Sequence, residues 1–232
     1  MNLKYMPFLR TKSGEVSAIS NLSPFALGRI KSLFRLTRDV PKNFGQSYVN
    51  NCSHVPILLD GEENSAITGS TISFITLYNY LTSNNCAIAP AISYAADPSY
   101  LAAVKTLSLS PLVGLTIKAG FADLPSVASW CIANGFDPSQ ANLVITIGDT
   151  SNHDPYMYGN YVSHAINSSV SYINSFKEIY INAFSAAKDH SGFILGRNLL
   201  PRKCWTTFIH TISKTNIEVN FSDFCQIHPS LE

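Results

Sequence analysis

The chain has 232 residues, of which 46% are hydrophobic and only 13% are charged, and its formal net charge is +1. This length suits one domain with a single large core. The near-neutral charge argues against a nucleic-acid-binding surface or a polybasic membrane patch. No apolar run approaches the roughly 20 residues of a membrane helix, and the N-terminal residues lack the apolar core of a signal peptide. We therefore expect a cytoplasmic protein that binds neither nucleic acid nor membrane. A weakly charged surface is poorly soluble by itself, so we also expect the protein to bind a partner protein.

The five cysteines are scattered along the sequence, odd in number and without a CxxC pair. This usage is typical of reduced, mostly buried thiols in a cytosolic protein. The clustering of His and Cys that a zinc site needs is absent from the sequence. We expect neither a metal nor a cofactor. The cysteines are Cys52, Cys86, Cys131, Cys204 and Cys225.

Short apolar runs alternate with helical patterns along the chain. Most of the runs are continuous apolar segments, which is typical of strands covered on both faces. In chain order they are Tyr5–Leu9, Ser32–Arg38, Val55–Asp60, Ala87–Tyr94, Leu112–Lys118, Leu143–Gly148, Glu178–Phe184 and Ile217–Phe221.

Helix signals lie between these runs. A polar helical pattern follows the first run directly. Ser23, Asp97 and Asp154 each precede a proline, and an N-cap residue followed by proline at the first helical position is a strong start signal. Gly135 can form a left-handed C-cap. The predicted helices include Asp97–Thr106, Pro125–Asn134, a segment from Pro155 to about Asn174, and Arg202–Ile212.

The alternation of about eight strands with helices predicts a parallel sheet. Eight units in this length fit a single compact (β/α)8 barrel of the TIM type that covers residues 1–232. The alternative is an open doubly wound sheet. A Gly-rich phosphate turn, which would support that alternative, is missing from the sequence.

Charged and polar residues follow the predicted strands in a chain that has few charges to place. In a parallel barrel these positions meet at one rim, where function collects. The competing interpretation is that strand ends emerge into solvent and that loops are polar in any case. Asp60 is the strongest candidate because it ends the "PILLD" strand itself. The candidate rim site consists of Arg10, Lys12, Glu15, Asp60, Lys118, Asp149, Arg197, Gln226 and His228.

Complete catalytic motifs are not found. Asp149, His153 and Asp154 could form the rim of a metal-assisted hydrolase, but an Asp-Pro helix start explains Asp154 more simply. Cys225 and His228 are spaced too closely in a loop to form a nucleophile–base pair. We therefore assign no catalytic or metal-binding residue and expect that the chain is not an enzyme.

Tyrosines crowd one predicted helix. Tyr and Met are enriched in protein interfaces, and Met157 lies among the tyrosines. The alternative is a helix that covers the barrel with half-buried tyrosines. The candidate partner-binding residues are Tyr156, Tyr158 and Tyr161.

Several motifs, in order from residue 5 to residue 229, resemble the beta family of proteins, which is named after a protein of an enterobacterial satellite phage. The opening "YMPFLRTKSGEVSAISNLSP" resembles the family pattern YVPxLKxKxGExxALxxLSP. The other matching stretches are "PILLD", "DPSYLAAVK", "NLLPRKCW" and "FSDFCQIHP". Thr116 and Thr146 stand near the places where many relatives carry an Arg and an Asp, and this difference predicts a barrel mouth with fewer charges.

The resemblance implies a function in phage-borne defence. The phage member of the family resembles a protective, antitoxin-like partner of a toxic protein called Gop, and a small regulator is encoded beside them. By this resemblance, the chain is expected to restrain a Gop-like effector in the cytoplasm of a bacterial host. The alternative is a TIM-barrel enzyme or sensor that acts on a phosphorylated or nucleotide-like ligand at the carboxyl-terminal rim.

Overall fold

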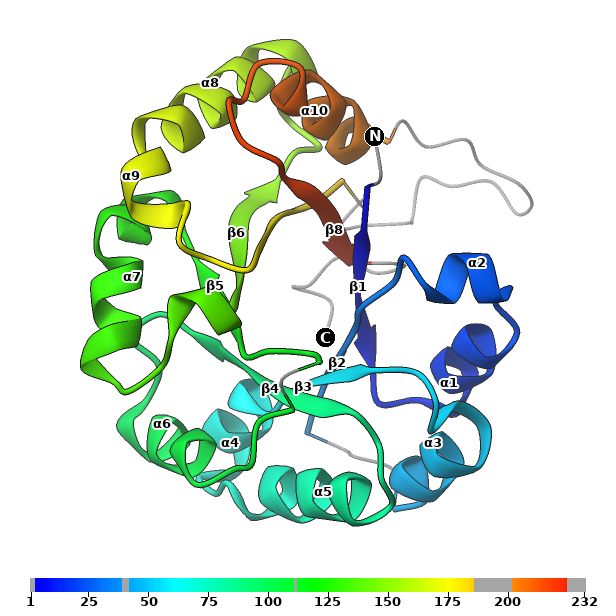
Figure 1. Cartoon of the computed structure of the whole chain (residues 1–232). Coiled ribbons are helices and arrows are strands. Elements are labelled where there is room, and N and C mark those ends of the chain that lie inside the picture. The colour runs from blue at the N-terminus through cyan, green and yellow to red at the C-terminus, as the bar shows by residue number, and fades with distance from the viewer. Residues whose placement is uncertain (1–2, 39–41, 111, 186–201, 225–232) are drawn as a thin grey trace.

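The computed structural model describes residues 3–38, 42–110, 112–185 and 202–224. Eight parallel strands form a closed barrel in which every strand pairs with its neighbours in chain order (Figure 1). The predicted (β/α)8 barrel is therefore confirmed. The strands are β1 (Tyr5–Arg10), β2 (Ser32–Arg35), β3 (Ile57–Asp60), β4 (Ile88–Ser93), β5 (Thr116–Ala119), β6 (Asn142–Asp149), β7 (Glu178–Phe184) and β8 (Asn220–Phe224).

Helices surround the barrel (Figure 1). They are α1 (Ser13–Ser20), α2 (Pro24–Leu27), α3 (Phe44–Cys52), α4 (Glu62–Thr68), α5 (Ile72–Ser83), α6 (Pro98–Lys105), α7 (Leu124–Ala133), α8 (Pro155–Ser168), α9 (Val170–Ile173) and α10 (Lys203–Ile212). Two short 3-10 helices are η1 (Phe121–Asp123) and η2 (Pro138–Gln140). Within the described ranges, no helix combines the length and apolar character needed to cross a membrane.

The predicted caps are confirmed where side chains bond to the backbone. Ser23 accepts from the Ala26 amide, Asp97 from the Ser99 amide, and Asp154 from the Tyr156 and Met157 amides. Several boundaries differ from the prediction. β2 ends at Arg35 rather than Arg38, and β5 begins at Thr116 rather than Leu112. The helix from Pro155 breaks at Ser169 into α8 and α9, and the last strand begins three residues later than expected, at Asn220.

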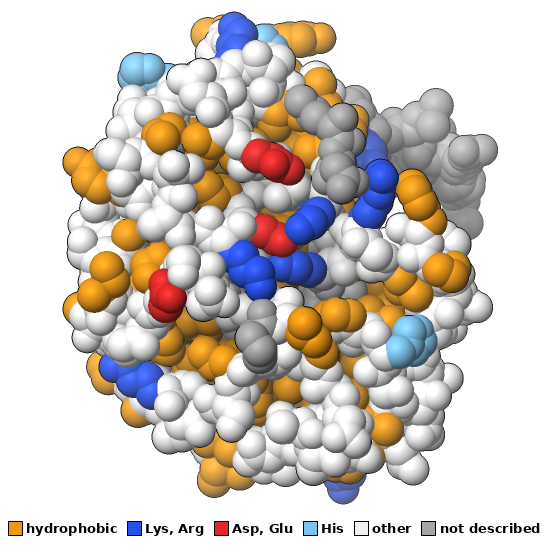
Figure 2. Space-filling view, viewed as in Figure 1, with side chains coloured by type: hydrophobic (Ala, Val, Ile, Leu, Met, Phe, Trp, Pro, Cys, Tyr) orange, Lys and Arg blue, Asp and Glu red, His pale blue; other side chains and the backbone are white. Residues whose placement is uncertain are grey.

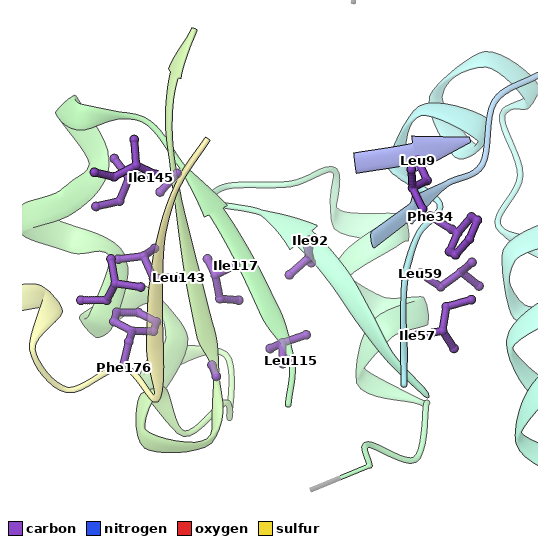
Figure 3. Close-up of a cluster of buried hydrophobic side chains, with 14 of the residues drawn as sticks. Leu9, Phe34, Ile57, Leu59, Ile92, Leu115, Ile117, Leu143, Ile145 and Phe176 are labelled. Atoms are coloured by element: carbon purple, nitrogen blue, oxygen red, sulfur yellow. The ribbon is translucent and has the colours of Figure 1, made fainter. Parts of the chain in front are cut away.

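Side chains alternate between the two faces of the barrel wall. Inward-facing Met6, Phe8, Leu33, Leu58, Val144 and Tyr180 belong to the core inside the barrel. The residues between them point outward into a second, larger core under the helices, part of which is drawn in Figure 3. Because side chains alternate along each strand, polar residues that lie two positions beyond an inner-core residue also face the inside of the barrel.

A network of ion pairs lies across the amino-terminal end of the barrel. Glu178 pairs with Lys4 at 2.5 Å and with Lys31 at 2.7 Å, and the Tyr180 hydroxyl donates to Glu178 at 2.6 Å. Figure 2 looks onto this end and shows basic side chains gathered around acidic ones near the middle of the face. Residues at this end of a TIM barrel usually serve stability, which leaves the opposite end as the candidate site.

Candidate ligand site in the barrel mouth

The carboxyl-terminal mouth of the barrel holds a buried ion pair between β3 and β5. Asp60 lies two residues beyond the inner-core residue Leu58, so its side chain also faces inward. Lys118 lies two residues beyond Thr116 on β5. The Lys118 Nζ lies 2.5 Å from Asp60 Oδ2, and the Asp60 side chain is only 4% exposed. Thr116 brings no charge to the mouth, but Lys118, two residues later on β5, does.

Glu62, at the start of α4, completes the cluster. Its Oε2 lies 3.1 Å from Lys118 Nζ, and it also accepts hydrogen bonds from the Ser93 hydroxyl at 2.6 Å and the Ser93 amide at 3.1 Å. The Glu62 amide in turn donates to Asp60 Oδ1 at 3.1 Å. Four charged or polar groups from β3, α4, β4 and β5 therefore hold one another in place.

The two carboxylates keep Lys118 protonated. Burial by itself would lower the pKa of Lys118, but the charges of Asp60 and Glu62 outweigh it and raise the pKa above its usual value. An amine held in this state cannot act as a nucleophile or a base at neutral pH. Lys118 can donate hydrogen bonds and present a positive charge, and the carboxylates can accept.

Close packing beneath the cluster fixes its position. The Tyr100 hydroxyl accepts from the Gly61 amide at 2.8 Å and donates to the Ala91 carbonyl at 3.0 Å. Burial, and then the nearby charge of Asp60, raises the pKa of Tyr100 well above its ordinary value. A Cβ on Gly61 would lie 2.6 Å from the ring of Phe74, so only glycine fits between Asp60 and Glu62.

The mouth is open to solvent beside β6. Thr146 is exposed, although Ile145 and Ile147 on either side of it are buried. Val144, two residues earlier on the same face, is part of the filled inner core. The barrel interior is therefore packed at the level of Val144, whereas the wall at Thr146 is accessible to solvent and to a ligand.

A buried polar chain lines the wall next to Thr146. Asn182 pairs in register with Thr146, and its amide nitrogen donates to the Ser222 hydroxyl at 3.0 Å. Ser222 donates to the Met6 carbonyl at 2.7 Å, which fixes the orientation of the Asn182 amide. Asn182 Oδ1 is buried and accepts no hydrogen bond from any group in the described part of the chain. A buried acceptor without a donor costs on the order of 1 kcal/mol or more, and a water or a ligand that donates to this oxygen would remove that cost.

The remaining rim candidates are distributed around the mouth. Arg10 ends β1 in register with Arg35, and Arg35 pairs with Glu63 at 2.7 Å. Lys12 is exposed just after β1. Burial raises the pKa of Glu15, while Lys12 and Arg10 oppose this effect. Arg197, Gln226 and His228 lie outside the described residues, as does Cys225.

The predicted Asp-Pro helix start explains the loop after β6. Asp149 accepts from the Ser151 amide at 2.8 Å, and Asp154 caps α8. His153 stacks on Tyr158 with ring centroids 4.5 Å apart. The described residues contain no group of three His, Cys, Asp or Glu that could hold a metal ion.

The three candidate tyrosines differ in their surroundings. Tyr156 and Tyr161 are 59% and 56% exposed. Tyr158 is half-buried, and its hydroxyl donates to the Ile147 carbonyl at 2.6 Å. Tyr158 is thus tied to the barrel wall, whereas Tyr156, Met157 and Tyr161 are exposed on α8, and we call these three side chains the tyrosine surface.

Sequence reasoning identified Asp60 and Lys118 but missed other polar residues of the mouth. Ser93, Arg35 and Asn182 were not among the candidates. The signal for Arg35 was its spacing of two from the inward Leu33, but the second strand was expected to extend to Arg38, so Arg35 was not expected at a strand end. Asn182 lies within a strand and carries no local signal.

Comparisons with known proteins show little. No protein-family profile matches the sequence, and no curated protein is significantly similar to it. Among solved structures, the chain is similar to the Paramecium bursaria Chlorella virus arginine decarboxylase, with 10% identity and a TM-score of 0.37. The match covers 97% of this chain and 58% of that chain. The barrel assignment rests on the strand order of the chain itself.

Proposed function

We propose that this chain binds a small polar ligand in the mouth of its barrel, as an enzyme or as a sensor. The observation that carries the proposal is the buried Lys118 held between Asp60 and Glu62, at the end of the barrel that opens to solvent at Thr146. Buried charges are costly to hold, and clusters of them in a mouth are typical of functional sites.

The pairing of charges favours a particular kind of ligand. Lys118 faces two carboxylates, and Arg35 is paired with Glu63, so these cations carry no surplus positive charge. A phosphate dianion needs such a surplus, whereas an uncharged or zwitterionic polar molecule can bond to both donors and acceptors of the cluster. The phosphorylated or nucleotide-like ligand predicted from the sequence is therefore less favoured for this site than an uncharged or zwitterionic one.

Thermal unfolding in the presence of a ligand panel tests this proposal. The panel contains phosphate, nucleotides, divalent ions, amino acids, sugars and polyols. We expect one polar compound to raise the melting temperature, because a ligand that binds only the folded state stabilises it. The shift should disappear in Asp60→Asn and persist in Asp137→Asn, a control at the other end of the barrel. Failure of the whole panel, or a shift that Asp60→Asn leaves intact, would contradict the proposal.

The tyrosine surface supports a second candidate, the protective function that the beta-family resemblance implies. Tyr156, Met157 and Tyr161 are exposed on one helix, and exposed aromatic residues are common binding hot spots. A Gop-like effector would be the partner, with or without the adjacent small regulator. Co-expression with the effector tests the candidate by cell survival. Tyr156→Ala with Tyr161→Ala should abolish protection and leave the fold intact.

Asp60→Asn separates the two candidates in the same assay. A chain that protects only through the tyrosine surface should protect fully with Asn at position 60. Loss of protection with Asp60→Asn, while the complex with the effector still forms, would show that protection depends on the mouth instead.

A further inference from the structure

Within the described ranges, three strands carry a buried asparagine that faces the inside of the barrel. Asn142 and Asn220 begin β6 and β8, at the amino-terminal end, whereas Asn182 lies on β7, two residues beyond the inner-core residue Tyr180 and towards the mouth. Asn142, Asn182 and Asn220 are 0%, 1% and 4% exposed. A buried amide needs a partner for its oxygen as well as for its nitrogen, so the three residues can be compared directly.

The two asparagines at the amino-terminal end have partners on both sides of the amide. Asn142 donates to a main-chain carbonyl at 3.0 Å and accepts from Lys31 at 3.2 Å. Asn220 donates to the Ile179 carbonyl at 3.3 Å and accepts from the Lys4 amide at 2.9 Å. Both side chains therefore tie segments of the barrel wall together.

Asn182 differs because only its nitrogen has a partner. The Ser222 hydroxyl has one proton, which it donates to the Met6 carbonyl at 2.7 Å, so towards Asn182 it can only accept. The Asn182 nitrogen supplies that bond at 3.0 Å, and Oδ1 accepts none from the described residues. Rotating the amide by half a turn would place Oδ1 against the Ser222 oxygen, which has no proton left to donate. Either orientation therefore leaves Oδ1 without a donor.

This oxygen belongs to the part of the wall that borders the mouth. Thr146, which pairs in register with Asn182, is exposed. Val144 and Tyr180 pair one level lower and fill the barrel interior there. In the closed barrel β7 lies four strands from β3, so Asn182 is on the wall opposite Asp60. A molecule resting on the filled core of the barrel therefore has the Asp60–Lys118 cluster at one end and Asn182 at the other.

We propose that the ligand of the mouth donates a hydrogen bond from an O–H or N–H group to Asn182 Oδ1, while its other end meets the Asp60–Lys118 cluster. This inference rests on the proposed function and narrows it. The ligand is an uncharged or zwitterionic compound with a hydroxyl, amide or ammonium group at the end away from the cluster. A compound whose groups there only accept hydrogen bonds leaves the Asn182 oxygen unpaired, and the site rejects it.

The first test needs no ligand. The chain is freed of small molecules by dialysis, and the melting temperatures of Asn182→Ala and Asn220→Ala are compared. Asn220→Ala strands the Lys4 amide and the Ile179 carbonyl, whereas Asn182→Ala removes an unpaired oxygen. The melting temperature should therefore fall at least about twofold less in Asn182→Ala than in Asn220→Ala. An equal or larger fall would mean that a trapped water already bonds to the oxygen, and it would overturn the proposal.

The second test uses two small probes. Acetamide and N,N-dimethylacetamide both accept hydrogen bonds, but only acetamide can donate them. The side-chain amide NMR signal of Asn182, identified by its loss in Asn182→Ala, is followed while each probe is added. We expect a saturable shift with acetamide, binding at least about tenfold weaker with the dimethylated probe, and no shift of the Asn220 signal. Equal responses to the two probes, or no saturable response to acetamide, would overturn the proposal.

The ligand panel of the proposed function separates the two claims. A compound that stabilises the wild type should bind Asn182→Ala at least about tenfold more weakly. A stabilisation that Asp60→Asn abolishes and Asn182→Ala leaves intact would overturn the role of Asn182 and leave the mouth site standing. Failure of the whole panel would contradict the proposed function, and the acetamide pair would then decide on Asn182 by itself.

Discussion

At the scale of single residues, Lys118 is the cation that holds the two carboxylates of the mouth together. Its side chain is 17% exposed and its ammonium lies 2.5 and 3.1 Å from two carboxylates, so each charge has lost part of its water and gained a partner. Such a cluster adds little net stability as a whole, because desolvation offsets the attraction. Removing one member is different, since the others are left buried without compensation.

We predict that Lys118→Met destabilises the fold. Asp60 and Glu62 would then face each other without a cation, and the free energy of unfolding should fall by on the order of 3 kcal/mol. Urea unfolding at pH 7 measures the change. Adding Asp60→Asn should recover part of the loss.

Lys105→Met is the matched control for this prediction. Lys105 is exposed and bonds only to the Asn134 side chain among the described residues, so the substitution should change stability by less than about 0.5 kcal/mol. Equal effects of the two lysine substitutions would contradict the account of the mouth cluster.

At the scale of elements, α8 and α10 pack closely because α8 carries a glycine at their contact. A Cβ on Gly159 would lie 2.8 Å from His210 Cδ2 and 3.1 Å from the Thr207 carbonyl oxygen. His210 also lies within 3.0 Å of Asn160 and meets the Tyr156 ring edge-on at 5.3 Å. The glycine therefore allows the close approach of α8 to α10.

Gly159→Ala should lower the free energy of unfolding by about 1–3 kcal/mol, because the added methyl group forces the two helices apart. Thermal or urea unfolding measures the loss. Gly14→Ala in α1 is the control, since a Cβ there meets nothing within 4 Å and alanine is the better helix former. A neutral Gly159→Ala would show that the helices can separate without cost.

The success of sequence reasoning for the helices depended on capping. The helices α2, α6 and α8 were predicted from a Ser or Asp before proline, and those side chains cap them. No helix was predicted for Phe44–Cys52, Glu62–Thr68 or Ile72–Ser83. The N-cap residues of these three helices, Asn43, Gly61 and Thr71, make no side-chain cap hydrogen bond, and the start signal of Ser or Asp before proline is missing there.

The candidate site was predictable only in part, for a related reason. Asp60 and Lys118 could be placed at the rim because each lies at or near the end of an apolar run. Their contact depends on β4 lying between β3 and β5, which brings together residues 58 positions apart. Asn182 and Ser222 meet through the pairing of β7 with β8, and periodicity along one strand does not report such neighbours.

At the scale of the whole molecule, the two ends of the barrel have different roles. At the amino-terminal end Glu178 lies between Lys4 and Lys31, whereas at the carboxyl-terminal end Thr146 is exposed to solvent. Burial alone would raise the pKa of Glu178, but hydrogen bonds from Lys31, Lys4 and Tyr180 outweigh it and lower the pKa to about 2.

This shift predicts an acid-dependent loss of stability. A carboxylate whose pKa is lowered by folding stabilises the protein above its unfolded pKa of about 4.5 and loses that contribution as the pH falls towards about 2. The contribution is at most about 3 kcal/mol. The stability difference between the wild type and Glu178→Gln should therefore shrink between pH 6 and pH 2.5. A difference that stays constant over this range would contradict the lowered pKa.

The central claim is that the carboxyl-terminal mouth binds a small polar molecule, and native mass spectrometry of the purified chain tests it most directly. The protein is incubated with a small-molecule extract of bacterial cells and separated from unbound compounds before measurement. We predict one adduct of small mass at a stoichiometry of one, present in the wild type and in Lys105→Met and absent from Asp60→Asn. A folded wild-type chain without an adduct, or an adduct that Asp60→Asn retains in full, would contradict the claim.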